Sequence, residues 1–258
     1  MTRHSSDLII GTHEEKGASR FWQLAPKQPI HENQVVAWKF CHVLHKLLRD
    51  GHPNVIPQSI RHRAALVELG RTWGEAHGKL VKCYVDFLLA KLKFHENYPG
   101  FPGNVQVGED RLQLLGGDDI NYYFQLGAVI FDYLEDILAL QSAVFGSLGA
   151  SQSNSSTRAG HSRLAVLIPC ILESSLLFDY TVKIMFKLHA DLSRDVLVGH
   201  RRRFHKTLPQ LRKFYKDAGA IQSLKNLIDI PLLPQDSTES FSFMNHVPSS
   251  RTDFTGSA

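Results

Sequence analysis

The chain has 258 residues, of which 43% are hydrophobic and 21% are charged, a balance that excludes a protein disordered throughout. The net charge of +4, with 14 histidines counted as neutral, favours anionic partners without choosing between phospholipid and nucleic acid. The three cysteines, Cys41, Cys83 and Cys170, are odd in number and far apart, so we expect free thiols rather than a disulfide framework.

Membrane-spanning and secretory segments are not expected. The longest apolar run, Leu164–Leu172, contains Pro169 and is well short of the ~20 residues that a spanning helix needs. The first residues lead into Ser5 and Ser6 rather than into the apolar stretch of a signal peptide. We therefore expect a cytoplasmic protein whose membrane contacts are peripheral.

The first half of the chain predicts helices and almost no strands. Thr12 and Glu15 form a capping-box pattern, which predicts a short helix running to about Leu24. A helix is predicted over 33–49, ended by Gly51 in a left-handed conformation. Its apolar stripe consists of Val36, Phe40, Val43, Leu44 and Leu47.

Longer helices follow. The periodicity predicts one helix over 61–94, a Pro- and Gly-rich loop over 97–107, and a helix over 119–148 with Asp119 at its N-terminus. The Ser-rich stretch over 149–160 predicts an exposed connection. The segment over 164–189 is apolar around much of its circumference, so we expect it at the centre of the protein.

Two further helices are predicted, over 192–218, where Pro209 can kink or divide the helix, and over 221–230. The Ser- and Thr-rich residues 235–258 lack periodicity and predict a disordered tail. The fold class is all-α, a superhelical stack or solenoid of long antiparallel helices in one domain over 1–234.

Metal binding and catalysis are not favoured. His42 and His45 are close enough in sequence to share a metal ion, but no third ligand or His-Glu-x-x-His signature accompanies them. We interpret both as polar residues at the edge of a buried face. Nucleophile elbows, Walker loops and dinucleotide fingerprints are also missing. The sequence predicts no metal, no cofactor and no enzymatic activity.

The predicted helix over 192–218 carries a basic face. A solvated charged face is the simpler interpretation; the functional one is contact with anionic lipid, at about 1 kcal/mol for each Lys or Arg. Nucleic acid is disfavoured, because the aromatic residues here follow the core stripe instead of interleaving with the cations. The residues of this basic face are Arg201, Arg202, Arg203, Lys206, Arg212 and Lys213.

Several segments resemble one family. The string Trp38–Val55 is similar to the second core helix of the ANTH domain in the huntingtin-interacting protein 1 family of endocytic clathrin adaptors. Other matching blocks extend the resemblance from about Ile9 to Pro234: Gly11–Ala18, Phe124–Leu126, Phe131–Tyr133, Phe178–Lys183, Gly199–Arg201 and Ile230–Pro234. The resemblance implies a right-handed stack of long helices of the ANTH/ENTH type.

The resemblance also implies a lipid site on an exposed corner. In the family, a first helix and the turn after it present a Lys-x-Lys-His motif to the phosphates of phosphoinositide head groups. Arg3 and His4 fall on the last two positions of this motif, Met1 replaces a preceding lysine, and Lys16 is a further candidate. The family's preceding helix is absent from this sequence, so we expect reduced affinity for phosphoinositides.

The function implied by the resemblance is that of a phosphoinositide-binding membrane adaptor module of clathrin-mediated endocytosis. It would be peripheral at the plasma membrane and at clathrin-coated pits and vesicles, with endocytic proteins as partners. In longer relatives, regions absent here bind clathrin and actin and link coated pits to actin. The alternative is a protein-interaction scaffold, in which a groove or the 192–218 face holds a partner helix or peptide and lipid contributes little.

Overall fold

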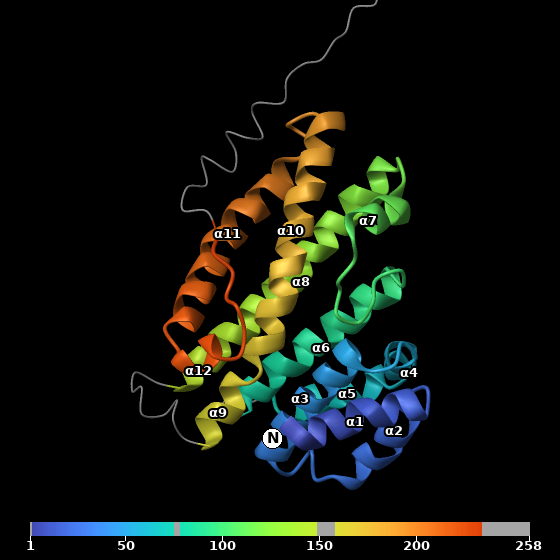
Figure 1. Ribbon diagram of the computed structural model, residues 1–258, viewed down its shortest axis with the longest axis vertical. Helices are drawn as coiled ribbons and strands as arrows, with labels where there is room; N and C mark the ends of the chain where they lie inside the picture. Colours follow the sequence, from blue (N-terminus) through green and yellow to red (C-terminus); the bar gives the residue numbers. More distant parts are fainter. Residues whose placement is uncertain (1, 75–77, 149–157, 234–258) are drawn as a thin grey trace, which may run out of the picture.

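The computed structural model describes residues 2–74, 78–148 and 158–233, and within these ranges no strand is present (Figure 1). The predicted all-α class is confirmed. The helices are α1 (Thr2–Glu14), α2 (Ser19–Leu24), the 3-10 helix η1 (Ala25–Lys27), α3 (Gln34–Asp50), α4 (Val55–Arg61), α5 (Arg63–Thr72), α6 (Lys79–Asn97), α7 (Glu109–Gly116), α8 (Ile120–Leu148), α9 (Arg158–Leu164), α10 (Leu167–Asp191), α11 (Val198–Gly219) and α12 (Gln222–Lys225).

Figure 1 shows α1 to α5 together at one end of the molecule, with α8, α10 and α11 running lengthwise away from them and α9 lying near the N-terminal helices. α1 packs on α3, and α3, α4 and α5 all pack on α6. α6 packs on α8, which in turn packs on α10 and α11. Each layer therefore contacts mainly its neighbours in the sequence, which is the arrangement of a helical solenoid. The predicted tail over 235–258 lies outside the described residues, so its disorder stays a prediction.

The two ends of α3 are fixed by an N-cap asparagine and a C-terminal glycine. Asn33 is its N-cap, and the side-chain Oδ1 accepts hydrogen bonds from the backbone N–H groups of Val35 and Val36 at 3.0 and 3.3 Å. Gly51 ends the helix with φ −80° and ψ 178°, so the predicted left-handed conformation is wrong. A Cβ at Gly51 would collide with the carbonyl oxygen of Leu47, and this close approach is what requires glycine.

The helix start predicted at Thr12 is also wrong, because Thr12 lies near the end of α1. The predicted end at Leu24 agrees with α2, which begins only at Ser19. The Thr12 hydroxyl donates to the carbonyl oxygen of Ile9 at 2.7 Å and accepts from the backbone N–H of His52 at 3.0 Å. The hydroxyl therefore connects α1 to the end of α3 instead of capping a helix. A capping box is a local pattern and does not distinguish these two uses.

The single helix predicted over 61–94 is divided into α5 and α6. Gly74 and Gly78 fall between them, and glycine is a poor helix former. A Cβ at Gly78 would collide with the backbone of Trp73, so the chain turns too tightly there for any other residue. The last predicted helix, over 221–230, shrinks to the single turn of α12.

Prolines in the second half leave the long helices intact. Pro169 is the third residue of α10, where no intrahelical N–H bond is lost, and α11 continues through Pro209. The predicted connection over 149–160 overlaps α9, and its residues 149–157 lie outside the described ranges.

One stretch, Gly160–Asp191, is long and apolar enough to cross a membrane by length and composition, contrary to the sequence prediction. However, 56% of its most apolar window is buried inside the protein, as expected of a core helix. α10 packs on α8, α9 and α11, which agrees with its predicted central place.

A buried charged cluster joins four of these helices. The Glu173 carboxylate on α10 accepts hydrogen bonds from Lys91 Nζ on α6 at 2.8 Å and from the Tyr133 hydroxyl on α8 at 2.7 Å. His45 Nε2 on α3 lies 3.2 Å from the same carboxylate, and Arg49 Nη1 lies 3.6 Å away. The side chains of Glu173, Lys91 and His45 are fully buried. Sequence periodicity marks these helix faces as apolar and did not reveal the cluster.

The ionisation of this cluster is set by its own charges. Burial alone would raise the pKa of Glu173, but the Lys91 ammonium and His45 outweigh it and hold that pKa below its usual range. Burial lowers the pKa of Lys91, opposed by the carboxylate beside it. The charges of Glu173 and Lys91 offset each other, so burial of either one is tolerated only while the other is present.

We predict that Glu173→Gln lowers the free energy of unfolding by about 3–5 kcal/mol, because it leaves the Lys91 ammonium buried without a counter-charge. Urea titration followed by circular dichroism measures the loss. The control is Lys82→Ala on α6, the helix that carries Lys91; it breaks the exposed Lys82–Asp86 pair and should cost less than about 1 kcal/mol. Equal losses in the two variants would contradict a central role for the buried cluster.

Candidate functional site

The turn after α1 contains Lys16, whose backbone has a positive φ angle. Lys16 has φ +56°, a backbone conformation that residues other than glycine rarely adopt. Its carbonyl oxygen accepts a hydrogen bond from Asn54 Nδ2 at 2.9 Å, and the backbone N–H of Ala18 donates to Gln58 Oε1. These bonds to α4 and the residue before it hold the turn in place, while the Lys16 side chain is exposed.

Two histidines lie beside this turn. The rings of His13 and His52 meet edge to face, with centroids 5.8 Å apart. His52 Nδ1 accepts a hydrogen bond from the backbone N–H of Asn54 at 3.2 Å, and Asn54 also binds the carbonyl of Lys16. We call His13, Lys16 and His52 the Lys16 corner. An ammonium and two imidazoles on one exposed corner are suited to phosphate oxygens.

A pocket of about 990 Å³ opens beside the Lys16 corner, between the end of α3, α4 and the loop that precedes α7. Its walls include four prolines and the apolar side chains of Leu48, Ile56, Ile60 and Phe101. Its charged and protonatable lining residues are His13, Arg49, Asp50, His52, His95, Glu96 and Arg111. The lining thus carries two arginines and two carboxylates, whose formal charges cancel.

The predicted lipid-binding residues are not brought together. Arg3 and His4 lie in the first turn of α1, and their side chains are outside the described part of the structure. Lys16 follows the other end of the same helix, about 15 Å away at 1.5 Å per residue. A single head group does not bridge that distance, so these residues would form two contact points along α1.

The predicted basic face of α11 is partly neutralised within the protein. Arg203 donates to the Ala128 carbonyl at 3.0 Å and to Asp132 Oδ1 at 2.7 Å, which ties α11 to α8. Lys206 Nζ lies 3.6 Å from a Glu135 carboxylate oxygen. Lys213 pairs with Asp217 on α11 itself. Arg202 is exposed, and Arg201 and Arg212 are half-buried. The face is therefore a weaker anion site than its sequence indicates.

The histidine and cysteine predictions have mixed outcomes. His45 lies in the centre of the protein rather than at an edge, where it binds Tyr84 at 3.1 Å and Glu173. Among the described residues, no group of three His, Cys, Asp or Glu side chains is placed to hold a metal ion. All three cysteines are free thiols; Cys41 and Cys170 are buried and Cys83 is half-buried.

Comparison with known proteins identifies the family. The family model for the ANTH domain matches residues 1–249. The chain belongs to the ANTH domain family. This ANTH domain is 46% identical to human huntingtin-interacting protein 1 over 237 residues, which cover 91% of the chain and 23% of the relative. It is 28% identical to the endocytosis protein end4 of Schizosaccharomyces pombe, over 91% of the chain and 21% of that relative. The chain thus spans less than a quarter of their length.

A solved structure agrees with the fold. The ENTH domain from epsin-2, solved in complex with phosphatidylinositol 4,5-bisphosphate, aligns with a TM-score of 0.79 at 27% identity and covers 90% of each chain. The family and fold predicted from the sequence are therefore confirmed.

Sequence reasoning missed the partners of Lys16. His13 and His52 are 39 positions apart, and only the packing of α1 against α3 brings their rings together. The one available sign was the concentration of three histidines in the string from His42 to His52. That string was explained by its apolar stripe and its helix end, which left His52 without a role.

The buried histidines make stability depend on pH. Burial lowers the pKa of His42 and of His95 to about 3 from an ordinary value of 6.5. Both stay neutral in the folded protein, whereas the unfolded chain takes up protons below pH 6.5, so stability falls as the pH drops. Asp136 acts in the opposite sense, because burial and the neighbouring carboxylates Asp86 and Asp132 raise its pKa to about 6.

We predict that the free energy of unfolding is about 2 kcal/mol lower at pH 5.5 than at pH 7.5, since the two histidines outweigh Asp136. Urea titrations at a series of pH values measure this difference. The variants His42→Gln and His95→Gln should each reduce the slope by about one proton. A stability that is flat or rises toward pH 5.5 would show that these rings are protonated in the folded state.

Proposed function

We propose that this ANTH domain attaches to membranes by binding phosphoinositide head groups and serves as an adaptor module in clathrin-mediated endocytosis. The observation that carries the proposal is the Lys16 corner, where the exposed Lys16 follows the end of α1, its backbone is held by Asn54, and the rings of His13 and His52 lie in contact. The similar epsin-2 domain was solved with phosphatidylinositol 4,5-bisphosphate, which supports an anionic lipid as the ligand.

The second contact point is the start of α1, where Arg3 and His4 lie. A membrane surface is extended, so it can contact both ends of α1 at once when α1 lies parallel to it. Each Lys or Arg near an anionic leaflet contributes about 1 kcal/mol, and few such residues are present here. We therefore expect weak attachment that depends on several head groups.

The endocytic part of the proposal comes from the relatives, one of which is named an endocytosis protein. The domain would act at the inner face of the plasma membrane and on coated pits and vesicles, as a peripheral protein with endocytic proteins as partners. Binding to clathrin and actin would belong to other parts of longer relatives. This function needs no catalysed reaction, because positioning a protein on a membrane requires only binding.

We predict that Lys16→Glu weakens binding to phosphatidylcholine vesicles containing phosphatidylinositol 4,5-bisphosphate by at least about fivefold, because it removes one attractive charge and adds a repulsive one. Arg3→Glu/His4→Glu should weaken it by a similar factor. Co-sedimentation measures both, with lipid-free and phosphatidylcholine-only samples as blanks.

The matched control is Arg202→Glu, which makes the same charge change on an exposed residue of α11. Binding should stay within about twofold of the unchanged protein, as expected of a charge outside the site. If Arg202→Glu weakens binding and Lys16→Glu does not, the lipid site is on α11 and the proposal is wrong.

Ionic strength distinguishes lipid attachment from the alternative of a protein-interaction scaffold. Raising the salt concentration from ~0.05 to ~0.5 M should release the domain from these vesicles, because screening shortens the reach of exposed charges severalfold. A fluorescence titration at each salt concentration measures the affinity. Vesicle binding that resists salt would indicate apolar contacts and would favour the scaffold.

A further inference from the structure

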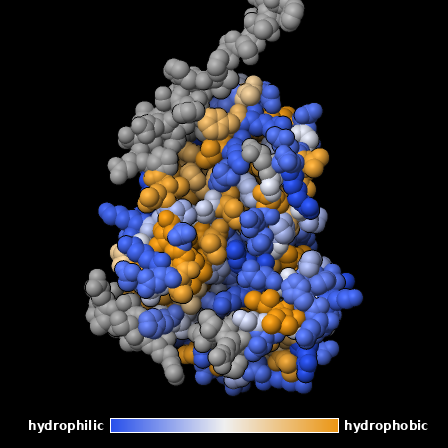
Figure 2. All heavy atoms as spheres, in the orientation of Figure 1, coloured by the Kyte–Doolittle hydropathy of each residue, from blue (hydrophilic) through white to orange (hydrophobic). Residues whose placement is uncertain are grey.

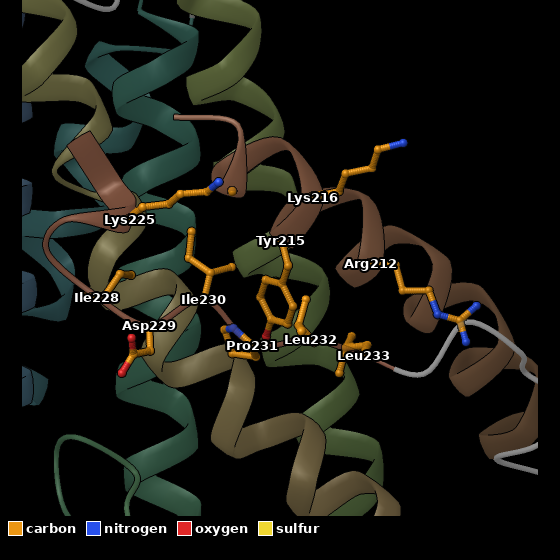
Figure 3. A pocket seen from close by; sticks show the side chains of 11 residues that line it. Arg212, Tyr215, Lys216, Lys225, Ile228, Asp229, Ile230, Pro231, Leu232 and Leu233 are labelled. Atoms are coloured by element: carbon orange, nitrogen blue, oxygen red, sulfur yellow. The ribbon is translucent and has the colours of Figure 1, made fainter. Parts of the chain in front are cut away.

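A groove of about 650 Å³ lies between α11 and residues 226–233, the described segment that follows α12. Figure 3 shows Tyr215 reaching down from α11 toward Ile230 and Leu232 on the opposite wall. Leu232 is 97% exposed, although it lies beside this apolar surface. Figure 2 shows hydrophobic atoms gathered on the same side of the molecule, over α11 and α12. Such a surface is complementary to apolar side chains.

Cations flank the apolar part of the groove. Arg212 lies at one end and Lys225 at the other, with Lys216 above them on α11 (Figure 3). Asp229 is the single carboxylate among the lining residues. The Nε and Nη2 atoms of Arg212 are buried, and neither has a hydrogen-bond partner in the described part of the chain. Buried N–H donors without an acceptor are costly, so this end of the groove is suited to a carboxylate.

The occupant that fits this surface is the segment 236–244 of the same chain, which lies beyond the described residues. Its sequence is Asp-Ser-Thr-Glu-Ser-Phe-Ser-Phe-Met, with Asp236 and Glu239 followed by Phe241 and Phe243. In an extended strand, residues two apart point to the same side, so both aromatic rings can face one apolar wall. The carboxylates that precede them match the arginine at the edge of the groove.

We propose that residues 236–244 dock in this groove, with an acidic residue on Arg212 and the two phenylalanines on the apolar wall formed by Tyr215, Ile228 and Ile230. Leu233 is itself a lining residue, so the chain enters the groove directly from its wall. The eight residue-to-residue steps from Leu233 to Phe241 can span up to about 26 Å. Because the segment is tethered, a weak contact is sufficient to keep it bound.

Photo-crosslinking in the full chain tests this docking. Phe243 is replaced by p-benzoylphenylalanine, the protein is irradiated, and mass spectrometry locates the crosslinks. We expect crosslinks within one molecule to the groove, at Ile228 or Ile230, which are more accessible there than the buried Tyr215. Arg212→Glu should lower their yield about fivefold, the effect expected of one or two partly exposed ion pairs.

Two further variants keep the outcome interpretable. Asp236→Asn/Glu239→Gln changes only the segment, cannot unfold the helices, and should lower the yield by a similar factor. Arg212→Glu combined with Asp236→Lys/Glu239→Lys should restore most of it. The control, Arg202→Glu, lies on α11 outside the groove and should have no effect.

Three results would overturn the proposal. They are crosslinks scattered over other surfaces, crosslinks between a labelled and an unlabelled copy in a mixed sample, and a groove crosslink whose yield is unchanged by the charge variants. The second result would assign the groove to a neighbouring copy of the chain. None of them bears on lipid binding, which involves a different part of the molecule.

Discussion

The carboxylate of Glu173 is the constraint on which this fold depends. It is fully buried, and its partners come from α3, α6 and α8 while it belongs to α10. A buried charge of this kind is tolerated only with its counter-charge in place, so the four helices have one arrangement that satisfies it. Apolar stripes alone allow helices to slide or rotate against each other, whereas hydrogen bonds to one carboxylate require a defined position of each partner.

The rigid stack gives the exposed residues their positions. α3 carries His45 and Arg49 of the cluster on its buried side, and its last turn adjoins Thr12 and His52 at the Lys16 corner. The histidine pair therefore depends on the packing of α1 on α3, which in turn depends on the placement of α3 in the core. This sequence of contacts fixes the positions of Lys16, His13 and His52 relative to the core.

The sequence predicted the fold class, the family and the long helices α3, α8, α10 and α11, because their apolar periodicity runs over many turns. It missed the break between α5 and α6, where the close approach of Gly78 to the backbone of Trp73 requires glycine. It also misread Thr12, whose hydroxyl accepts a hydrogen bond from His52, just after α3. For the site, Lys16 was a predicted residue, but its partner His52 was not. Such partners come from tertiary contacts between distant segments, which no local pattern encodes.

The most direct test of lipid attachment is a titration of the soluble head group, inositol 1,4,5-trisphosphate, into isotope-labelled protein, followed by amide chemical shifts. We expect shifts confined to the first turn of α1, residues 12–18 and residues 51–54. Shifts centred on α11 would contradict lipid attachment at the Lys16 corner. So would the absence of shifts at head-group concentrations equal to those at which the protein binds vesicles.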